Sequence, residues 1–304
     1  MSYPEFRELI FEALKEIVPE EITIKPVSAA KINSHIRYGI MFECAELSYA
    51  PTIYLEPFYA SFQNGSPIEA LAEELYCCYI EETGPIPECI NRLGRFEEAK
   101  KNIFVRMIHI EENKKLLEET PCVKYLDFAI IPYFEVNDES FFKGSILLKN
   151  SYLEYWGIDE DTFMSWAIQN TKDKKNVLLR SMSEVLTDFL TEEDIEFSGK
   201  TDDKMYVLTN EDKYFGAVLI YFPEVLEMIC QRIKEDFYLL PSSVHEWIII
   251  PATQIDEKEV LFHMVKYVNE SEVMEEEVLS DNIYYYSANS QKIYVYEHII
   301  DKND

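Results

Sequence analysis

Apolar side chains recur every three or four residues along several stretches of the chain, a spacing that predicts amphipathic helices. The first helix is expected over residues 5–17, with Ser2 as its cap and Pro4 in its first turn. Ser66-Pro67-Ile68-Glu69 is typical of another helix start, because its serine and glutamate can each bond a free backbone N–H group. Further helices are predicted over residues 95–119, 160–171, 223–233 and 257–268.

Shorter runs rich in β-branched and aromatic residues predict strands between these helices. Strands are expected over residues 22–29, 36–43, 51–58, 237–240 and 247–251, and residues 123–136 (broken by Pro132) and 142–148 are expected to pair across the polar turn 137–139. Two hairpins are expected, pairing 205–208 with 215–222 and 283–286 with 293–296. This order predicts an α+β fold of mixed, mainly antiparallel sheets with amphipathic helices packed on them. Two subdomains are expected, 1–190 and 205–304, joined by an exposed acidic connection over 191–204.

Composition narrows the classes of function. The 304 residues are 47% hydrophobic, enough to bury a core, and 57 acidic against 28 basic residues give a formal charge of -29. This charge excludes nucleic-acid binding through a broadly basic surface. Residues 1–150 hold 25 acids and 15 bases, whereas residues 151–304 hold 32 and 13, so -19 of the -29 lies in the second half. A basic protein partner is therefore expected there.

The chain shows no sign of export or membrane insertion. Its start alternates charged and apolar residues where a secretory signal has a plain apolar run, and its longest uncharged stretch is the twelve residues from Pro57 to Ile68. The six cysteines lack disulfide-like spacing and include no C-x-x-C pair, so a reduced cytoplasm is expected and a zinc site is not.

The strongest local candidate for chemistry is Leu240-Pro-Ser-Ser-Val-His-Glu246, which lies between two predicted strands. In one interpretation His245 is a general base, Ser242 or Ser243 a nucleophile or substrate contact, and Glu246 an acid. In the other, favoured interpretation, Ser243 and Glu246 form a capping box that starts a single helical turn. Position 249 is isoleucine, so the second histidine of a zinc-protease motif is missing.

Other candidates are weaker. Thr209 and Asn210 near the first hairpin, and Asn269 after a late helix, are polar residues that could line a pocket with His245, although asparagine also favours turns and helix ends. Cys230 precedes His245 by fifteen residues, but a small residue on a helix face is normally a packing residue. Nucleophile-elbow and phosphate-binding glycine motifs are absent from the sequence, and no cofactor or metal is expected.

Several segments together carry a family resemblance. They include Pro51-Thr-Ile-Tyr-Leu-Glu56, Met205-Tyr-Val-Leu-Thr-Asn210, the Leu240–Glu246 segment and Leu279-Ser-Asp281. Their order resembles an uncharacterised domain-of-unknown-function family found mainly in anaerobic Gram-positive gut bacteria, over roughly residues 40 to 300. The resemblance implies a bacterial, cytoplasmic protein, sometimes encoded near mobile elements, and assigns no activity. Trp247 departs from the smaller aliphatic residue expected after the His-Glu pair.

Three hypotheses of function follow. The leading one is a non-enzymatic binding or regulatory module for a basic protein partner, with no direct contact to nucleic acid or membrane. The second is a hydrolase or transferase of unrecognised type centred on His245, which requires a concave pocket and a second titratable group within hydrogen-bond reach. The third is an acidic nucleic-acid mimic or inhibitor from a mobile element. The sequence leaves the oligomeric state open.

Overall fold

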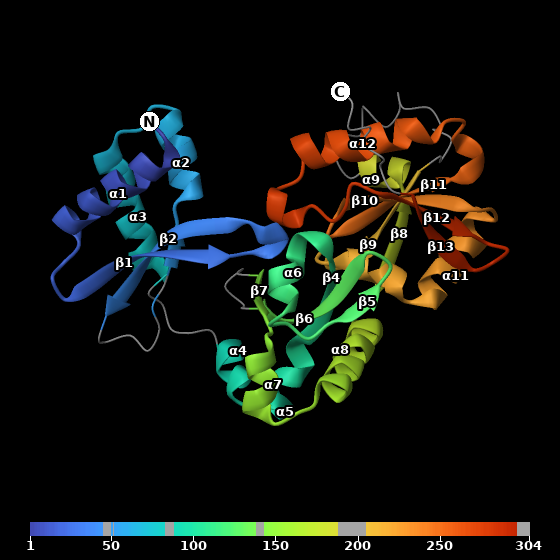
Figure 1. The fold of residues 1–304 in the computed structure, drawn as a ribbon, viewed down its shortest axis with the longest axis horizontal. Helices are drawn as coiled ribbons and strands as arrows, with labels where there is room; N and C mark the ends of the chain where they lie inside the picture. The colour runs from blue at the N-terminus through green and yellow to red at the C-terminus, as the bar shows by residue number, and fades with distance from the viewer. Residues whose placement is uncertain (45–49, 51, 83–87, 138–142, 188–204, 297–304) are drawn as a thin grey trace. The chain divides into compact units, whose positions relative to one another are not determined.

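The computed structural model describes residues 1–44, 50, 52–82, 88–137, 143–187 and 205–296, and the predicted connection over 191–204 lies outside them. The chain divides into two compact units, Met1–Glu88 and Cys89–Asp304 (Figure 1). This partition differs from the one expected from the sequence, because β8 (Val177–Ser181) and β9 (Tyr206–Asn210) are paired strands of one sheet. Both units combine helices with antiparallel sheets, and the predicted α+β class is confirmed.

The N-terminal unit places three helices with one three-stranded sheet of order β1-β2-β3. Its elements are α1 (Tyr3–Ile17), β1 (Ile22–Ala30), a 3-10 helix (Ile32–Ser34), β2 (Ile36–Cys44), β3 (Thr52–Tyr54), α2 (Glu56–Gln63) and α3 (Ile68–Glu82). The predicted first helix and its Ser2 cap are confirmed, with Ser2 and Glu5 forming a capping box. The strand expected over 51–58 is shorter, because the backbone turns at Leu55 and proline at the second position of α2 suits a helix start.

The second unit begins with a four-stranded sheet in which β6 pairs with β4, β5 and β7. The strands are β4 (Ile103–His109), β5 (Val123–Tyr125), β6 (Phe128–Asn137) and β7 (Lys143–Leu147). Around it lie α4 (Glu88–Asn91), α5 (Phe96–Ala99), α6 (Lys114–Leu117), α7 (Asn150–Trp156), α8 (Glu160–Lys174) and 3-10 helices at Arg92–Gly94, Lys100–Asn102 and Glu111–Asn113. Asp159 caps α8 as predicted, accepting a hydrogen bond from the Thr162 N–H group at 2.9 Å.

The helix predicted over residues 95–119 is wrong, since the middle of this segment forms β4. Six consecutive residues of β4, Ile103–Ile108, are buried, so apolar groups occupy both faces of the strand. A strand that is buried on both sides has no polar alternation, and its apolar residues then fit a helical spacing equally well.

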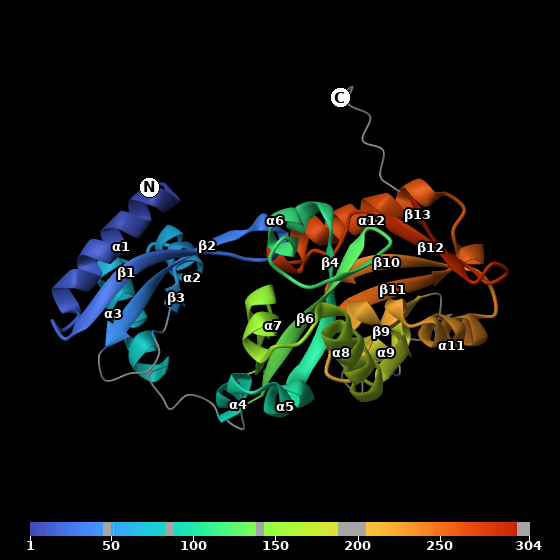
Figure 2. The ribbon, with the colours of Figure 1, turned by 60° about the horizontal axis from the view of Figure 1, so that its bottom comes forward.

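A six-stranded sheet of order β13-β12-β10-β11-β9-β8 completes the unit (Figure 2). Its other strands are β10 (Phe237–Ser243), β11 (Glu246–Pro251), β12 (Ile283–Ser287) and β13 (Lys292–Tyr296). The remaining helices are α9 (Met182–Thr187), α11 (Pro223–Ile233), α12 (Lys258–Ser271) and 3-10 helices at Gly216–Tyr221, Ala252–Gln254 and Glu275–Glu277. The strand predicted over 215–222 is wrong, because Gly216–Tyr221 is a buried 3-10 helix.

One large hydrophobic core joins the two sheets of the second unit. Phe128 of β6 lies 5.9 Å from Trp247 of β11 and 5.2 Å from Tyr284 of β12, measured between ring centroids. Trp247 is fully buried and donates a hydrogen bond from Nε1 to the Ala217 carbonyl oxygen at 2.8 Å. The 3-10 helix over Gly216–Tyr221 is therefore anchored to the hairpin that carries His245.

Candidate functional site

The Leu240–Glu246 motif forms the turn of the β10–β11 hairpin. Ser243 pairs with Glu246 at the end of the ladder, and the register shifts between Pro241 and Ser243. A strand-to-strand turn thus stands where the capping pattern predicts a helical turn. The Ser243 hydroxyl accepts a hydrogen bond from the His245 N–H group at 3.0 Å, and the Ser242 hydroxyl donates to Glu246 Oε1 at 3.2 Å.

The His245 ring is held from both of its nitrogen atoms. Nδ1 accepts a hydrogen bond from the Phe215 N–H group at 3.0 Å, and Nε2 lies 3.3 Å from Glu277 Oε1. The ring also stacks on Phe215 and Tyr214, with centroids at 5.3 and 5.5 Å. The side chain is 21% exposed.

This arrangement fixes the tautomer of His245. Because a backbone N–H group occupies the lone pair on Nδ1, the neutral ring carries its proton on Nε2 and donates it to Glu277. In this conformation neither ring nitrogen offers a free lone pair to a substrate. The contacts therefore describe an imidazole that fastens the hairpin to the Tyr214–Phe215 turn and to Glu277.

Thr209 and Asn210 lie beside the His245 turn. The Thr209 hydroxyl donates to the His245 carbonyl oxygen at 2.9 Å. The Asn210 side chain bonds both backbone groups of Tyr214, donating to its oxygen at 2.8 Å and accepting from its N–H at 3.1 Å. These polar groups are used in shaping the turn that ends in Phe215, whose φ is 54°.

Gly216 allows this close approach of the two turns. A Cβ atom at Gly216 would lie 2.6 Å from the His245 carbonyl oxygen and 2.7 Å from the Asn210 nitrogen. Both are backbone atoms, which cannot swing away as a flexible side chain can. Glycine at this position is therefore a steric requirement of the site.

Asn269 lies on α12 and belongs to a different set of contacts. Its Nδ2 donates to the Ser280 carbonyl oxygen at 3.0 Å and to Asp281 Oδ1 at 2.7 Å. It thus holds the end of α12 against the start of β12.

Arg106 is a buried residue of this region that the sequence analysis missed. It lies on β4, is 8% exposed, and places its guanidinium 4.7 Å above the Phe215 ring. Its Nε atom has no hydrogen-bond partner among the described residues. Burial lowers the pKa of Arg106 to about 10. Tyr214, Tyr133 and Glu276 act in the opposite direction and raise this pKa, but by less than burial lowers it. The only signal of Arg106 in the sequence is that it is the single basic residue within the apolar run Ile103–Ile108.

A second buried charge lies in the same sheet layer. Lys175, at the end of α8, forms ion pairs with Glu135 Oε2 at 2.6 Å and Asp212 Oδ2 at 2.7 Å. Lys175 and Glu135 are each 5% exposed. The two carboxylates compensate the buried charge of Lys175. The three side chains therefore form a structural link between α8, β6 and the turn after β9.

A third polar cluster centres on Asp127 in the β5–β6 turn. Its Oδ2 accepts hydrogen bonds from the Tyr284 hydroxyl at 2.7 Å and from Asn282 Nδ2 at 2.9 Å, and His109 Nε2 lies 3.6 Å away. Burial alone would raise the pKa of the Asp127 carboxyl, but the bonds from His109, Tyr284 and Asn282 outweigh it and lower the pKa. This carboxylate ties the four-stranded sheet to the six-stranded one.

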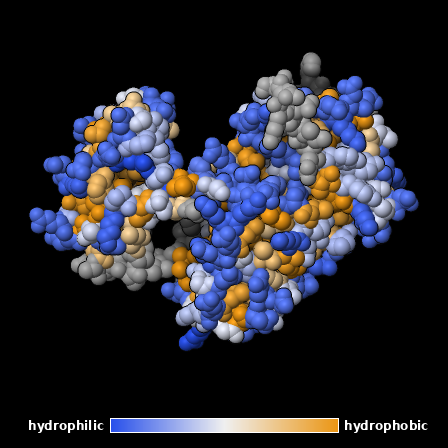
Figure 3. All heavy atoms as spheres, in the orientation of Figure 1, coloured by the Kyte–Doolittle hydropathy of each residue, from blue (hydrophilic) through white to orange (hydrophobic). Residues whose placement is uncertain are grey.

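Exposed apolar side chains occur on the outer surface of α12. Val260, Met264 and Tyr267 are exposed, as is Met274 shortly after the helix. In the view of Figure 3 hydrophilic residues dominate the visible surface, and hydrophobic residues form scattered groups between them. Among the described helices, α12 carries the most large apolar side chains that are exposed.

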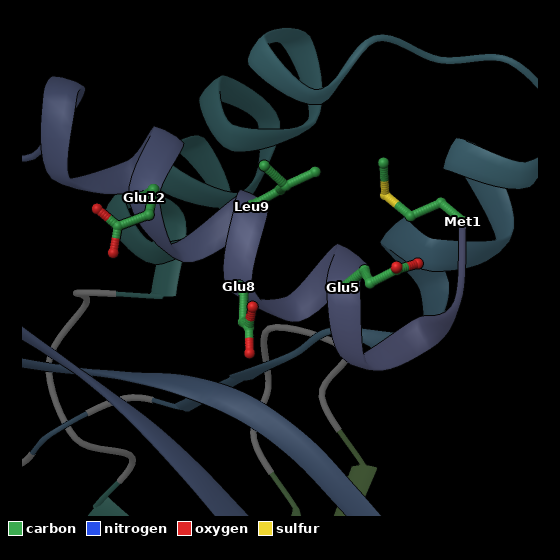
Figure 4. Close-up of a pocket in the computed structure, with 5 residues that line it drawn as sticks. All are labelled: Met1, Glu5, Glu8, Leu9 and Glu12. Carbon is green, nitrogen blue, oxygen red and sulfur yellow. The ribbon is translucent and has the colours of Figure 1, made fainter.

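An acidic depression lies on the outer side of α1 in the N-terminal unit. Met1, Glu5, Glu8, Leu9 and Glu12 line it, and Figure 4 shows the three carboxylates along one stretch of the helix. Glu5 bonds Ser2 and Glu12 bonds Lys15, so two of the three carboxylates already have local partners.

Among the described residues, no group of three histidine, cysteine or acidic side chains is arranged to hold a metal ion. Within the same part of the chain, no helix has the length and apolar character needed to cross a membrane.

The fold and the contacts around His245 define an α+β protein with two compact units and a tightly bonded hairpin in the second. The chain belongs to a family of unknown function, DUF5688, whose model matches residues 3–288. Comparison with curated proteins and with solved structures found no match.

Proposed function

We propose that this protein is a non-enzymatic binding module of the bacterial cytoplasm that recognises a basic, amphipathic segment of a partner protein. The observation that carries the proposal is an apolar stripe on the outer surface of α12 with exposed carboxylates on both sides of it in the sequence.

The apolar stripe is separate from the face that α12 uses for its own packing. Leu261 and Val265 point into the core and are almost fully buried. Val260, Met264 and Tyr267 follow each other at intervals of four and three residues, so they lie on one face of the helix. All three are exposed, and Tyr267 is 67% exposed. A helix that needed only to cover the sheet would carry polar residues there.

Carboxylates surround this stripe. The exposed acids are Asp256, Glu257, Glu259, Glu270, Glu272 and Glu275. The two lysines of the helix are engaged locally, because Lys258 Nζ lies 3.8 Å from the centroid of the Tyr296 ring and Lys266 Nζ lies 3.8 Å from Glu270. An apolar centre with an acidic rim complements a segment that carries apolar residues on one face and lysine or arginine on the other.

Glu277 supplies the second titratable group that the enzyme hypothesis requires, but the bond from the Phe215 N–H group occupies the lone pair on Nδ1 of His245, which favours a binding role. Both ring nitrogens are engaged, one by the Phe215 N–H group and one by Glu277. The hairpin and its neighbouring turn then serve as a rigid scaffold for the sheet on which α12 packs.

The test uses synthetic helical peptides of defined composition. A lysine–leucine amphipathic peptide, a lysine–serine peptide and a glutamate–leucine peptide would be titrated against the full-length protein at low and moderate salt. We expect the lysine–leucine peptide to bind about tenfold more tightly than either other peptide, and more weakly as salt rises. Equal binding of the lysine–leucine and lysine–serine peptides, or no effect of salt, would contradict the proposal.

Site variants separate α12 from the general acidity of the protein. The triple variant Val260→Gln/Met264→Gln/Tyr267→Gln keeps helix-forming residues and should lose most of the lysine–leucine binding. The matched control Leu9→Gln/Ile17→Gln/Tyr155→Gln also removes three exposed apolar side chains, including one beside the acidic depression of α1. It should bind like the parent protein. A loss in the control with none in the α12 variant would refute the assignment to α12.

A further inference from the structure

The N-terminal unit contains a small cavity between α1 and the strands β1 and β2. Its volume is about 210 Å³. The described residues that line it are Pro4, Arg7, Glu8, Phe11, Pro26, Val27, Tyr38, Gly39, Ile40 and Leu55. Most are apolar, and the charged ones are the base Arg7 and the acid Glu8. A small cavity with apolar walls and a few polar or charged groups is the usual form of a site for a small ligand.

Arg7 is held rigidly in this cavity by aromatic rings. Its guanidinium lies 3.7 Å from the centroid of the Tyr38 ring and 5.4 Å from that of Tyr3. Stacking uses the flat face of the guanidinium and leaves the N–H groups free at its edge. The cation is thus oriented before any ligand arrives.

The edge of this guanidinium has an unused donor. Arg7 Nε is buried and lacks a hydrogen-bond partner among the described residues. The nearby Glu56 does not supply one: its Oε1 accepts from the Tyr3 hydroxyl at 3.0 Å and from the Tyr38 N–H group at 2.9 Å, and its buried Oε2 has no hydrogen-bond partner among the described residues. Burial and the bond to Glu56 raise the pKa of Tyr3, so the phenol keeps the proton that it donates. A buried donor of a charged group that lacks an acceptor is costly in the free protein.

A carboxylate matches this donor best. Side-on pairing of a carboxylate with arginine uses Nε–H together with one terminal N–H group, which gives two parallel charge-assisted bonds. Glu8 stands at the same cavity, so its charge opposes that of any anionic ligand and disfavours a dianion more strongly than a monoanion. The apolar walls formed by Phe11, Val27 and Ile40 favour a compact aromatic or branched body.

We propose that this cavity binds a monoanionic carboxylate with a small apolar body, held by Arg7. Two sources share this chemistry, a free small organic acid and the C-terminal carboxylate of a peptide that ends in an apolar residue. The site lies in the N-terminal unit, so it is independent of the surface on α12 and of the function proposed for it.

The experiment measures binding to the full-length protein by ligand-observed NMR and calorimetry. The probes are 3-phenylpropionate, its neutral amide and inorganic phosphate, together with a short peptide ending in phenylalanine as the free acid or as the amide. We expect the free acids to bind about tenfold more tightly than the matching amides, and phosphate to bind no better than the amides. Preference for the small acid or for the peptide acid identifies the source. Equal binding of acid and amide, or no binding of any acid, overturns the proposal.

Three variants locate the site. Arg7→Met keeps the length and much of the stacking and should weaken acid binding about tenfold. The control Lys114→Met removes an exposed charge that pairs with Glu111 in the second unit, and it should leave binding unchanged. Val27→Phe keeps Arg7 and should block binding by filling the cavity, which tests the proposal even where Arg7→Met is poorly folded. Unchanged acid binding in both cavity variants would refute the site.

Discussion

The carboxylate of Asp127 is expected to be one of the strongest single links in the second unit, and Asp127→Asn tests this. Asp127 Oδ2 accepts two hydrogen bonds, from Tyr284 and Asn282, at 2.7 and 2.9 Å. Its side chain is 23% exposed, so water replaces these bonds only in part. Bonds to charged groups contribute about 1.5 to 3 kcal/mol each.

The expected loss in the free energy of unfolding is smaller than the sum of two such bonds. Asparagine keeps one oxygen as an acceptor, and the Tyr284 hydroxyl retains its contact with Ser280 Oγ at 2.9 Å. The variant loses the negative charge, and its NH2 group takes the place of Oδ1, a buried atom that has no hydrogen-bond partner among the described residues. We therefore expect a loss of about 2 kcal/mol at neutral pH.

The pH dependence has a definite sign. The folded pKa of Asp127 lies below the ordinary value, so its contribution is complete above the unfolded pKa of about 4. It is lost as the pH falls through the lower, folded pKa, where the protonated acid no longer accepts charge-assisted bonds. The difference between parent protein and Asp127→Asn should therefore shrink between pH 7 and about pH 3.

Urea unfolding followed by tryptophan fluorescence measures this loss in the relevant unit. All three tryptophans, Trp156, Trp166 and Trp247, lie in residues 89–304, and the Trp247 ring is 5.3 Å from that of Tyr284. The exposed Asp256→Asn is the matched control and should change stability by less than about 0.5 kcal/mol. A loss for Asp127→Asn no larger than that of the control, or one that stays constant with pH, would refute the reasoning.

Three further variants test other features of the second unit by the same unfolding measurement. Gly216→Ala should cost about 2 kcal/mol or more, because the new Cβ meets backbone at 2.6 Å; a stable variant would show that the turns can separate. Arg106→Met should raise the free energy of unfolding by about 1 to 3 kcal/mol, because burial holds the arginine pKa at about 10; destabilisation would mean that the charge is compensated. Asp159→Ala should cost about 1 kcal/mol through the lost helix cap, and no loss would show that the bond to Thr162 is dispensable.

Amphipathic helices and their ends were predictable from the sequence. The α1 helix begins behind Ser2 and buries Phe6, Ile10 and Leu14 at helical spacing. Asp159 precedes α8 and caps it. These signals are local, because a cap bonds within three residues and a stripe repeats within a turn, so neighbouring residues contain all the information.

The fully buried segments were not predictable in the same way. Ile103–His109 and Gly216–Tyr221 are both mainly apolar runs of similar length, yet one is a buried strand at the edge of its sheet and the other a 3-10 helix. Without a polar face, neither run shows a period that separates strand from helix. Strand pairing to β6 settles the first, and the bond between Trp247 and the Ala217 carbonyl oxygen helps to settle the second.

The candidate site shows the same division. The sequence identified His245, Thr209 and Asn210 as polar groups that could gather, and the structure brings them together around Phe215. The sequence could not show that Glu277, thirty-two residues after His245, contacts the imidazole. Nor could it show that Arg106 lies over the Phe215 ring. Both contacts join segments distant in the chain, and their spacing carries no period.

The sequence by itself determined the α+β class, several helix starts, the hairpin at 283–296 and the large acidic surplus of the second half. The tertiary structure alone decided the partition at residues 88 and 89, the strand identity of β4 and the bonded state of His245. The physical reason is the distance along the chain over which each interaction acts. Capping and amphipathic spacing act over a few residues, whereas sheet pairing and burial of charge depend on which distant segments the core brings into contact.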